Sequence, residues 1–184
     1  MIDWPIQKIG EIDLELLMKE IGHIKKPEEG PRQFPFQKKK NAEDAEESKG
    51  TNFVLRTDEF DYDTLIYSND EFPYLNSIIT EYKMLRTRKM WMHEKFNYAW
   101  HLDNSPRIHI PLHTNEHCMW IIRDGHNNEE DRVYRIPADG GVYLIDTTVP
   151  HTFLNANADP FMRTHIVGAT TITTDTIPLP KDRS

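Results

Sequence analysis

Apolar and polar residues follow two different periods along the chain. Near the start, apolar residues between Ile9 and Ile24 recur at intervals of three and four, which is the period of an amphipathic helix. We therefore expect one helix over residues 9–24 and another over residues 72–84. The rest of the chain reads mostly as short strands separated by turn residues. These expected strands cover residues 53–56, 63–67, 90–93, 98–103, 107–112, 118–123, 132–136, 142–146 and 162–169.

The strand-like runs after residue 90 have no helical stretch between them, which excludes a parallel α/β sheet and favours a β-sandwich or jelly roll. Residues 25–50 differ, because half of them are charged and few are apolar. Such a segment buries too little apolar surface to offset the entropy of ordering it. We expect a surface loop there, or a substrate lid in which Arg32 and Phe34 would make the contacts. The prediction is one domain over 1–184, with a helix in 1–24, a charged loop in 25–50 and a jelly-roll core in 51–184.

Charge and composition exclude several classes of partner. The formal net charge of -8 argues against binding to nucleic acid. No apolar run reaches the length of a membrane-spanning helix, and the first residues do not resemble a signal peptide. A single cysteine, Cys118, excludes an intrachain disulfide and suits a reducing compartment. We therefore expect a cytoplasmic protein with no membrane partner; the sequence carries no sign of its oligomeric state.

Histidine usage directs attention to metals. The chain has nine histidines and one cysteine, so a metal would be bound through imidazole and carboxylate and not through thiolate. Ligands of these kinds favour iron, manganese or catalytic zinc over structural zinc or an iron–sulfur cluster.

The segment around His101 and Asp103 is the first candidate site. Side chains two apart on a strand leave the same face, so this imidazole and this carboxylate can share a metal ion. With a second histidine from a distant strand they would form a two-histidine, one-carboxylate triad, which leaves positions open for substrate and oxygen.

The next strand has one polar and one apolar face. Arg107 and His109 share one face, and Ile108, Ile110 and Leu112 share the other. The polar face could lie in water, or it could face a metal and bind a carboxylate, because arginine presents a planar bidentate donor.

A later segment brings a further histidine and arginine. A glycine turn leads into the apolar strand 142–146, and a proline turn then places His151 at the start of the next strand. Arg163 follows further along the chain. A buried dicarboxylate cosubstrate would need such an arginine for its far carboxylate.

Taken together and in this order, His101-Leu102-Asp103, His151 and Arg163 resemble the Fe(II)/2-oxoglutarate-dependent oxygenases. More narrowly, the chain from about residue 89 to 169 is similar to the aspartyl/asparaginyl β-hydroxylase-like family, which includes cis-proline hydroxylase-type enzymes. The resemblance implies a double-stranded β-helix fold.

The same resemblance implies a role for each residue. His101, Asp103 and His151 would hold Fe(II), and Arg163 would pair with the far carboxylate of 2-oxoglutarate. His109 matches a histidine that contacts the cosubstrate, and Arg107 matches an arginine that can hold an acidic group of the substrate. The implied activity is hydroxylation of a C–H bond with O2, releasing succinate and CO2. The substrate could be an amino acid, a peptide side chain or a small molecule, with Arg107 favouring one that bears a carboxylate.

Two other hypotheses remain open. One is a cupin-type metalloenzyme that does not use 2-oxoglutarate, and the other is a catalytically silent jelly-roll binding module. The remaining candidates are expected to be structural: His93 and His165 in or near the core, Tyr98 and Trp100 packed beside the site. The basic run of Lys83, Arg86, Arg88 and Lys89 is expected on a solvated face, with an anionic substrate as the alternative.

Overall fold

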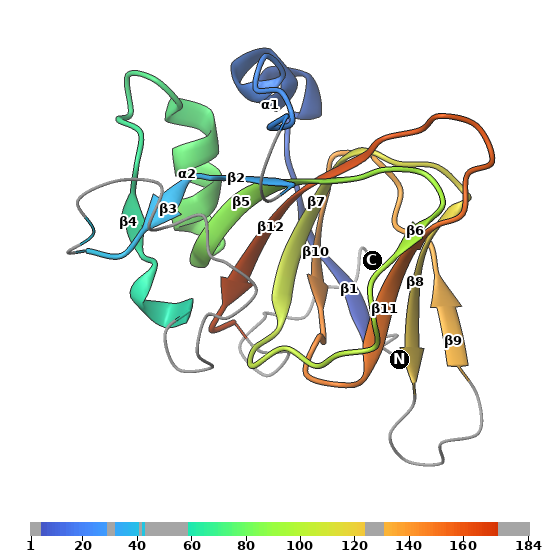
Figure 1. Ribbon diagram of the computed structural model, residues 1–184. Helices are drawn as coiled ribbons and strands as arrows, with labels where there is room; N and C mark the ends of the chain where they lie inside the picture. Colours follow the sequence, from blue (N-terminus) through green and yellow to red (C-terminus); the bar gives the residue numbers. More distant parts are fainter. Residues whose placement is uncertain (1–4, 29–31, 41, 43–58, 124–130, 173–184) are drawn as a thin grey trace, which may run out of the picture.

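Antiparallel strands account for most of the fold in the computed structural model, which describes residues 5–28, 32–40, 42, 59–123 and 131–172 (Figure 1). Six strands form the large sheet, in the spatial order β1 (Ile6–Glu11), β10 (Gly141–Ile145), β7 (Arg107–His113), β12 (Arg163–Thr170), β5 (Met84–Met92) and β2 (Gln33–Pro35). Four strands form the small sheet, in the order β6 (Phe96–Asn97), β11 (His151–Asn155), β8 (Cys118–Arg123) and β9 (Asp131–Tyr134).

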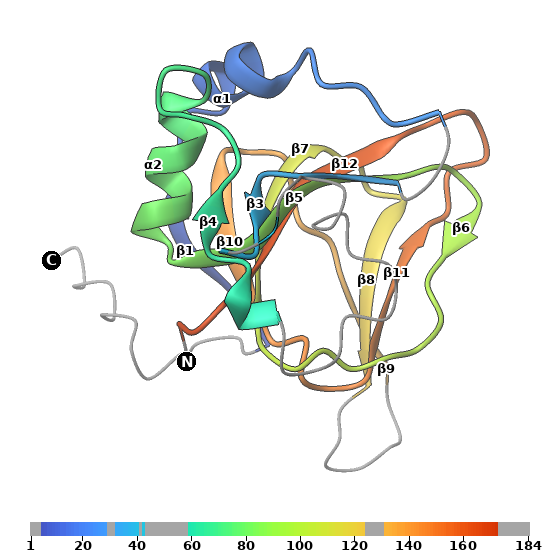
Figure 2. The same ribbon diagram turned by 60° about the vertical axis from the view of Figure 1, so that its left-hand side comes forward.

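Two helices cover the outer face of the large sheet, and the small sheet lies on its other side (Figure 2). The helices are α1 (Leu14–Ile21) and α2 (Pro73–Glu81). A short 3-10 turn, η1 (Glu59–Asp61), and a ribbon of β3 (Gln37–Lys38) with β4 (Thr64–Leu65) lie beside α2. Neither helix is long and apolar enough to cross a membrane, and the described residues contain no other α-helix.

Two apolar clusters hold these layers together. The outer cluster joins the helices to the large sheet through residues such as Leu17, Leu75 and Ile110. The inner cluster joins the two sheets, with Met92 and Ile145 from the large one packed near Trp120 and Phe153 from the small one. The mainly β class expected from the sequence is therefore confirmed.

The expected helix over residues 9–24 is wrong in its first part. Residues up to Glu11 form β1, which pairs with β10 at the edge of the large sheet. The helix begins only at Leu14, because the Asp13 carboxylate accepts a hydrogen bond of 2.9 Å from the Leu16 backbone N–H and caps it. Gly10 lets the Tyr82 ring approach this strand closely, since a Cβ at this position would collide with the ring.

The expected charged loop over residues 25–50 is also wrong in part. β2 pairs with β5 as an edge strand, and Phe36 is buried in the outer cluster. Phe34 stacks on Tyr67 with ring centroids 5.8 Å apart, so it packs inward and does not cover a pocket. These apolar contacts are what order a segment of such high charge. Residues 29–31, 41 and 43–50, like the expected strand 53–56, lie outside the described part of the chain.

The strands that position the site follow the sequence expectation closely. β8 has the expected bounds, while β7, β10 and β12 differ by one residue at one or both ends. The expected strand over 98–103 is wrong, because this segment is a loop, held to β11 by a bridge between His101 and His151 and by the Tyr98 N–H, which donates to the Phe153 carbonyl at 3.0 Å. β6 ends just before it, at Asn97.

Candidate metal centre

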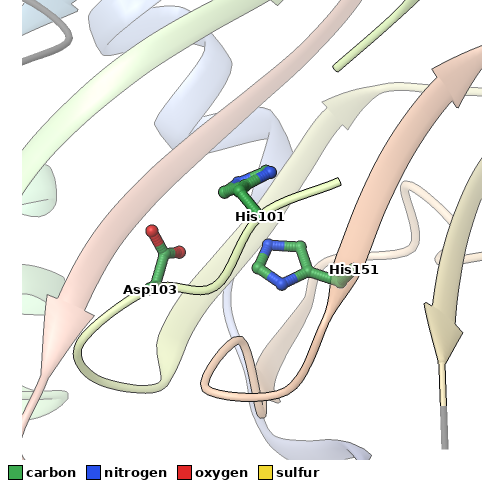
Figure 3. Close-up of side chains that lie close together, drawn as sticks. All are labelled: His101, Asp103 and His151. Atoms are coloured by element: carbon green, nitrogen blue, oxygen red, sulfur yellow. The ribbon is translucent and has the colours of Figure 1, made fainter. Parts of the chain in front are cut away.

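Three side chains converge where the small sheet meets the loop that precedes β7. His101, Asp103 and His151 each offer one ligand atom, and these three atoms lie within 4.8 Å of one another. Figure 3 shows both imidazoles and the carboxylate turned toward the same space. The sequence-based prediction grouped the same three residues. It expected strand alternation to align His101 with Asp103, whereas a loop places them.

Backbone hydrogen bonds hold this loop against β11. The His101 N–H donates to the His151 carbonyl at 3.1 Å, and the His151 N–H donates back at 3.0 Å. Two residues on, the Asp103 N–H donates to the Thr147 carbonyl at 2.8 Å. The loop therefore has a fixed position relative to the start of β11, although it is not a strand.

Both imidazoles are held in the tautomer that suits a metal ligand. The Nδ1 atom of His101 lies 2.8 Å from the Ala99 carbonyl, and that of His151 lies 2.9 Å from the Val149 carbonyl. A carbonyl oxygen can only accept, so each Nδ1 carries the hydrogen and each Nε2 keeps its lone pair. Orienting bonds of this kind on the far nitrogen are typical of metal-ligating histidines.

The carboxylate is held in its ionised form. Burial by itself would raise the pKa of Asp103, but the Arg107 guanidinium, together with His151 and His101, outweighs it and the pKa lies below its ordinary value. Arg107 Nε is 3.1 Å from Asp103 Oδ2, and its terminal nitrogen donates to Ser105 Oγ at 2.8 Å. Burial lowers the pKa of His151, which keeps this imidazole neutral. An ionised carboxylate and a neutral imidazole are the protonation states that a metal ligand requires.

A cavity of about 130 Å³ opens beside the triad between the two sheets. Its floor is the inner face of the large sheet. The pairing of β12 with its neighbours β5 and β7 shows which side chains lie next to one another on this floor. Arg163 pairs across with Met92 on β5, and Val167 lies opposite both His109 on β7 and Arg88 on β5. The sequence prediction that Arg107 and His109 share one strand face is confirmed, and this face lines the cavity instead of meeting bulk water.

Arg163 is a buried cation without a carboxylate partner among the described residues. Its guanidinium lies 4.4 Å from the centre of the Phe153 ring and donates to His165 Nδ1 at 3.0 Å. Burial lowers the pKa of Arg163 to about 10, so it remains charged at neutral pH. His109 Nδ1 lies 3.4 Å from His165 Nδ1. Burial, followed by the charge of Arg163, moves the pKa of both histidines well below the ordinary value.

Sequence reasoning missed one residue that lines this pocket and one that supports its arginine. His165 was expected in or near the core, and it is buried there, but it also contacts Arg163. Arg88 was expected on a solvated face, yet it lines the cavity. Alternation along β12 and β5 could have indicated both, because His165 shares a face with Arg163 and Arg88 shares one with Met90 and Met92.

Other expected bystanders have varied surroundings. Lys89 is buried, not solvated, and its ammonium donates to the Ile21 and Ile24 carbonyls at the end of α1. Tyr98 lines the cavity, whereas Trp100 is 41% exposed and lies under the guanidinium of Arg123.

A scan against protein-family models finds no match for this sequence, and a search of curated proteins finds no similar protein. The geometry thus carries the functional argument by itself. It supports a His-Asp-His group, of which His151 is buried, that could hold a metal ion next to a pocket rich in arginine.

Proposed function

We propose that the protein is an Fe(II)- and 2-oxoglutarate-dependent oxygenase with a double-stranded β-helix fold, similar to the aspartyl/asparaginyl β-hydroxylase-like family. One observation carries the proposal: a two-histidine, one-carboxylate ligand set shares its cavity with the buried cation Arg163. Two imidazoles and one carboxylate on one side of a metal form the donor set of non-haem Fe(II) oxygenases.

The strand order supports the fold. Strands β5 to β12 divide equally between the two sheets, as β10-β7-β12-β5 in the large sheet and β6-β11-β8-β9 in the small one. Every step along this part of the chain crosses to the other sheet, except the β8–β9 hairpin. Eight antiparallel strands in two facing sheets are typical of a jelly roll.

The donor set passes a test of fit to iron. The Nε2 lone pairs of His101 and His151 and an ionised Asp103 carboxylate are available, and no thiolate lies among them. When bound, iron would supply the coupling of 2-oxoglutarate decarboxylation to C–H hydroxylation, with O2 as oxidant and succinate and CO2 as products.

The protein's own residues would bind and orient the cosubstrate. Arg163 would pair with its far carboxylate, because a guanidinium withdrawn from water is stabilised by an anion that enters the cavity. His109 would contact the same molecule from the neighbouring strand β7. Arg107 holds the Asp103 carboxylate at 3.1 Å, which fixes the ligand oxygen and leaves part of its guanidinium on the cavity side.

The test combines metal content with turnover. We expect the anaerobically prepared protein to bind one equivalent of Fe(II) and to release succinate from 2-oxoglutarate. The variants His101→Ala and His151→Ala should lose both properties, while His113→Ala, a change of an exposed histidine at the end of β7 in the large sheet, should keep them. Full turnover in either triad variant would contradict the proposal.

Two outcomes would favour the other hypotheses. Bound metal without any 2-oxoglutarate affinity, and with Arg163→Ala indistinguishable from wild type, would point to a cupin-type metalloenzyme. Absence of tight metal binding would point to a binding module without catalysis.

A further inference from the structure

The charges that line the cavity do not balance. Three arginines contribute to its wall, Arg88, Arg107 and Arg163, and Asp103 is the single carboxylate among the lining residues that the structure describes. Asp103 is already engaged by Arg107 Nε at 3.1 Å. Guanidinium groups withdrawn from water are stable only when an anion or a set of acceptors compensates them. The pocket is thus built for more negative charge than the protein itself provides.

Arg88 is the arginine that the proposed cosubstrate does not explain. On β5 it lies opposite Val167, whereas Arg163 lies four residues earlier on β12, opposite Met92. Four residues of strand span about 13 Å, so the backbones of the two arginines start from different parts of the cavity wall. An anion gripped at its far end by Arg163 therefore leaves Arg88 for a second ligand.

The Nε atom of Arg88 is buried and finds no acceptor among the described residues. Burial, followed by the positive charges of Arg86 and Arg107, lowers the pKa of Arg88 to about 9, so the group is still cationic at neutral pH. A cavity-lining guanidinium whose Nε is unpaired matches a carboxylate, which accepts two parallel N–H bonds.

We propose that Arg88 recognises the carboxylate of the primary substrate, and that this substrate is a small organic acid or amino acid. The inference rests on the proposed function only in calling this ligand a substrate; the anion subsite itself stands on the cavity and its charges. We favour a small acid over a peptide side chain because Arg88 is difficult for a large ligand to reach. It lies on β5, between β2 and β12 within the large sheet, and its Nε is buried from solvent.

Acetate is the probe for this subsite, with acetamide as the neutral analogue of equal size. Binding is followed by saturation-transfer NMR on metal-free protein that carries Arg163→Gln. This substitution removes the second arginine of the cavity that has no carboxylate partner among the described residues. We expect acetate to bind to Arg163→Gln, and to bind at least tenfold more weakly to Arg88→Gln/Arg163→Gln. Acetamide should not bind to either. The matched control is Arg135→Gln/Arg163→Gln, which loses one exposed arginine outside the cavity and should bind acetate as Arg163→Gln does.

A second measurement separates this inference from the proposed function. Calorimetry of 2-oxoglutarate with Mn(II)-loaded protein should give the same affinity for wild type and Arg88→Gln within about twofold, and a loss of at least tenfold for Arg163→Gln. If 2-oxoglutarate binds to no variant while acetate binding still requires Arg88, the oxygenase proposal fails and the subsite stands. If Arg88→Gln weakens 2-oxoglutarate as much as Arg163→Gln does, Arg88 belongs to the cosubstrate site and the inference is overturned.

Two further results would overturn the inference. Equal acetate binding with and without Arg88 would make this arginine a structural residue. Displacement of acetate by the blocked peptide acetyl-Gly-Asp-Gly-amide would replace the small acid with a peptide side chain as the ligand. Thermal unfolding of each variant checks that the fold is retained, and Arg88→Lys, which keeps the charge without the planar fork, should retain part of the binding.

Discussion

The two faces of the large sheet bury side chains of different chemistry, although these side chains alternate along the same strands. On β7, Ile108 and Ile110 point outward into the cluster beneath the helices, whereas Arg107 and His109 point inward to the cavity. All four side chains are buried. Burial therefore does not distinguish structure from function here; the chemistry of what is buried does.

The energetic consequence is opposite on the two faces. Apolar side chains on the outer face contribute about 1.5–3 kcal/mol each when fully buried. Arginines on the inner face have lost water without gaining full compensation from the protein, which costs free energy in the absence of a ligand. The outer face stabilises the fold. The arginines of the inner face destabilise it in the absence of a ligand, and a bound anion would remove this cost.

The largest expected effect comes from breaking the outer face. Ile110→Ala should lower the free energy of unfolding by about 2–5 kcal/mol, because Ile110 is fully buried and its neighbours on the sheet cannot close the gap. Urea unfolding of the metal-free protein measures this. The control is Leu16→Ala on α1. Leu16 is 44% exposed, so this change should alter the free energy of unfolding by less than about 1 kcal/mol. Similar losses for both would refute the assignment of the outer face as the stabilising one.

The matching change on the inner face should separate stability from binding. Arg163→Met should weaken 2-oxoglutarate at least 100-fold, about 2.7 kcal/mol, since truncating one partner of a buried charge pair costs 2–5 kcal/mol. The unfolding free energy should stay within about 1 kcal/mol of wild type, because relief of a buried charge offsets the lost hydrogen bond to His165. A stability loss as large as that of Ile110→Ala would show that Arg163 is part of the core.

The contrast between the faces also explains what the sequence could predict. The triad and Arg163 are visible because few residue types bind metals or dicarboxylates, and their order along the chain is specific. The alternation of Arg107 and His109 with Ile108 and Ile110 indicates two faces. It cannot indicate that both are buried, since this depends on the helices and the small sheet.

Other features depend on contacts between distant segments. Apolar spacing near Ile9 suits a helix or an edge strand, and pairing with β10 decides for the strand. Arg88 and Lys89 look alike in a basic run, yet the sheet sends one into the cavity and the other to the end of α1. Charge counting treats both as solvated, so tertiary structure was needed to find the second anion subsite.

A smaller effect tests the buried histidines of the inner face. Burial, followed by the charge of Arg163, keeps the pKa of His109 and His165 well below 6.5. Below about pH 6.5, these histidines therefore bind protons in the unfolded chain but stay neutral in the folded protein. Stability from this source is complete above about pH 6.5 and falls as the pH is lowered, by up to about 1.4 kcal/mol per pH unit for each histidine.

Urea unfolding between pH 7 and 5, with a chelator present, measures this slope. His165→Gln should reduce the slope, because one fewer proton is taken up on unfolding. His117→Gln, a change of an exposed histidine, should leave it unchanged. A slope that His165→Gln does not alter would mean that His165 accepts its proton in the folded state.

The smallest expected effect concerns the loop that replaces the predicted strand 98–103. Thr147 Oγ1 donates to the Ser105 carbonyl at 2.8 Å and so ties this loop to the turn before β11. Thr147→Val should cost about 1 kcal/mol through this one bond. The same change should weaken Mn(II) binding several-fold, because the Asp103 carboxylate loses part of its support. The control is Thr164→Val on β12, whose hydroxyl makes only a 3.5 Å contact to the Met162 carbonyl. If Thr147→Val lowers stability but not metal affinity, the backbone bonds of His101 and Asp103 alone hold the ligands. The position of the metal ligands would then be set by the backbone hydrogen bonds to β11 and to the turn before it, and not by the Thr147 side chain.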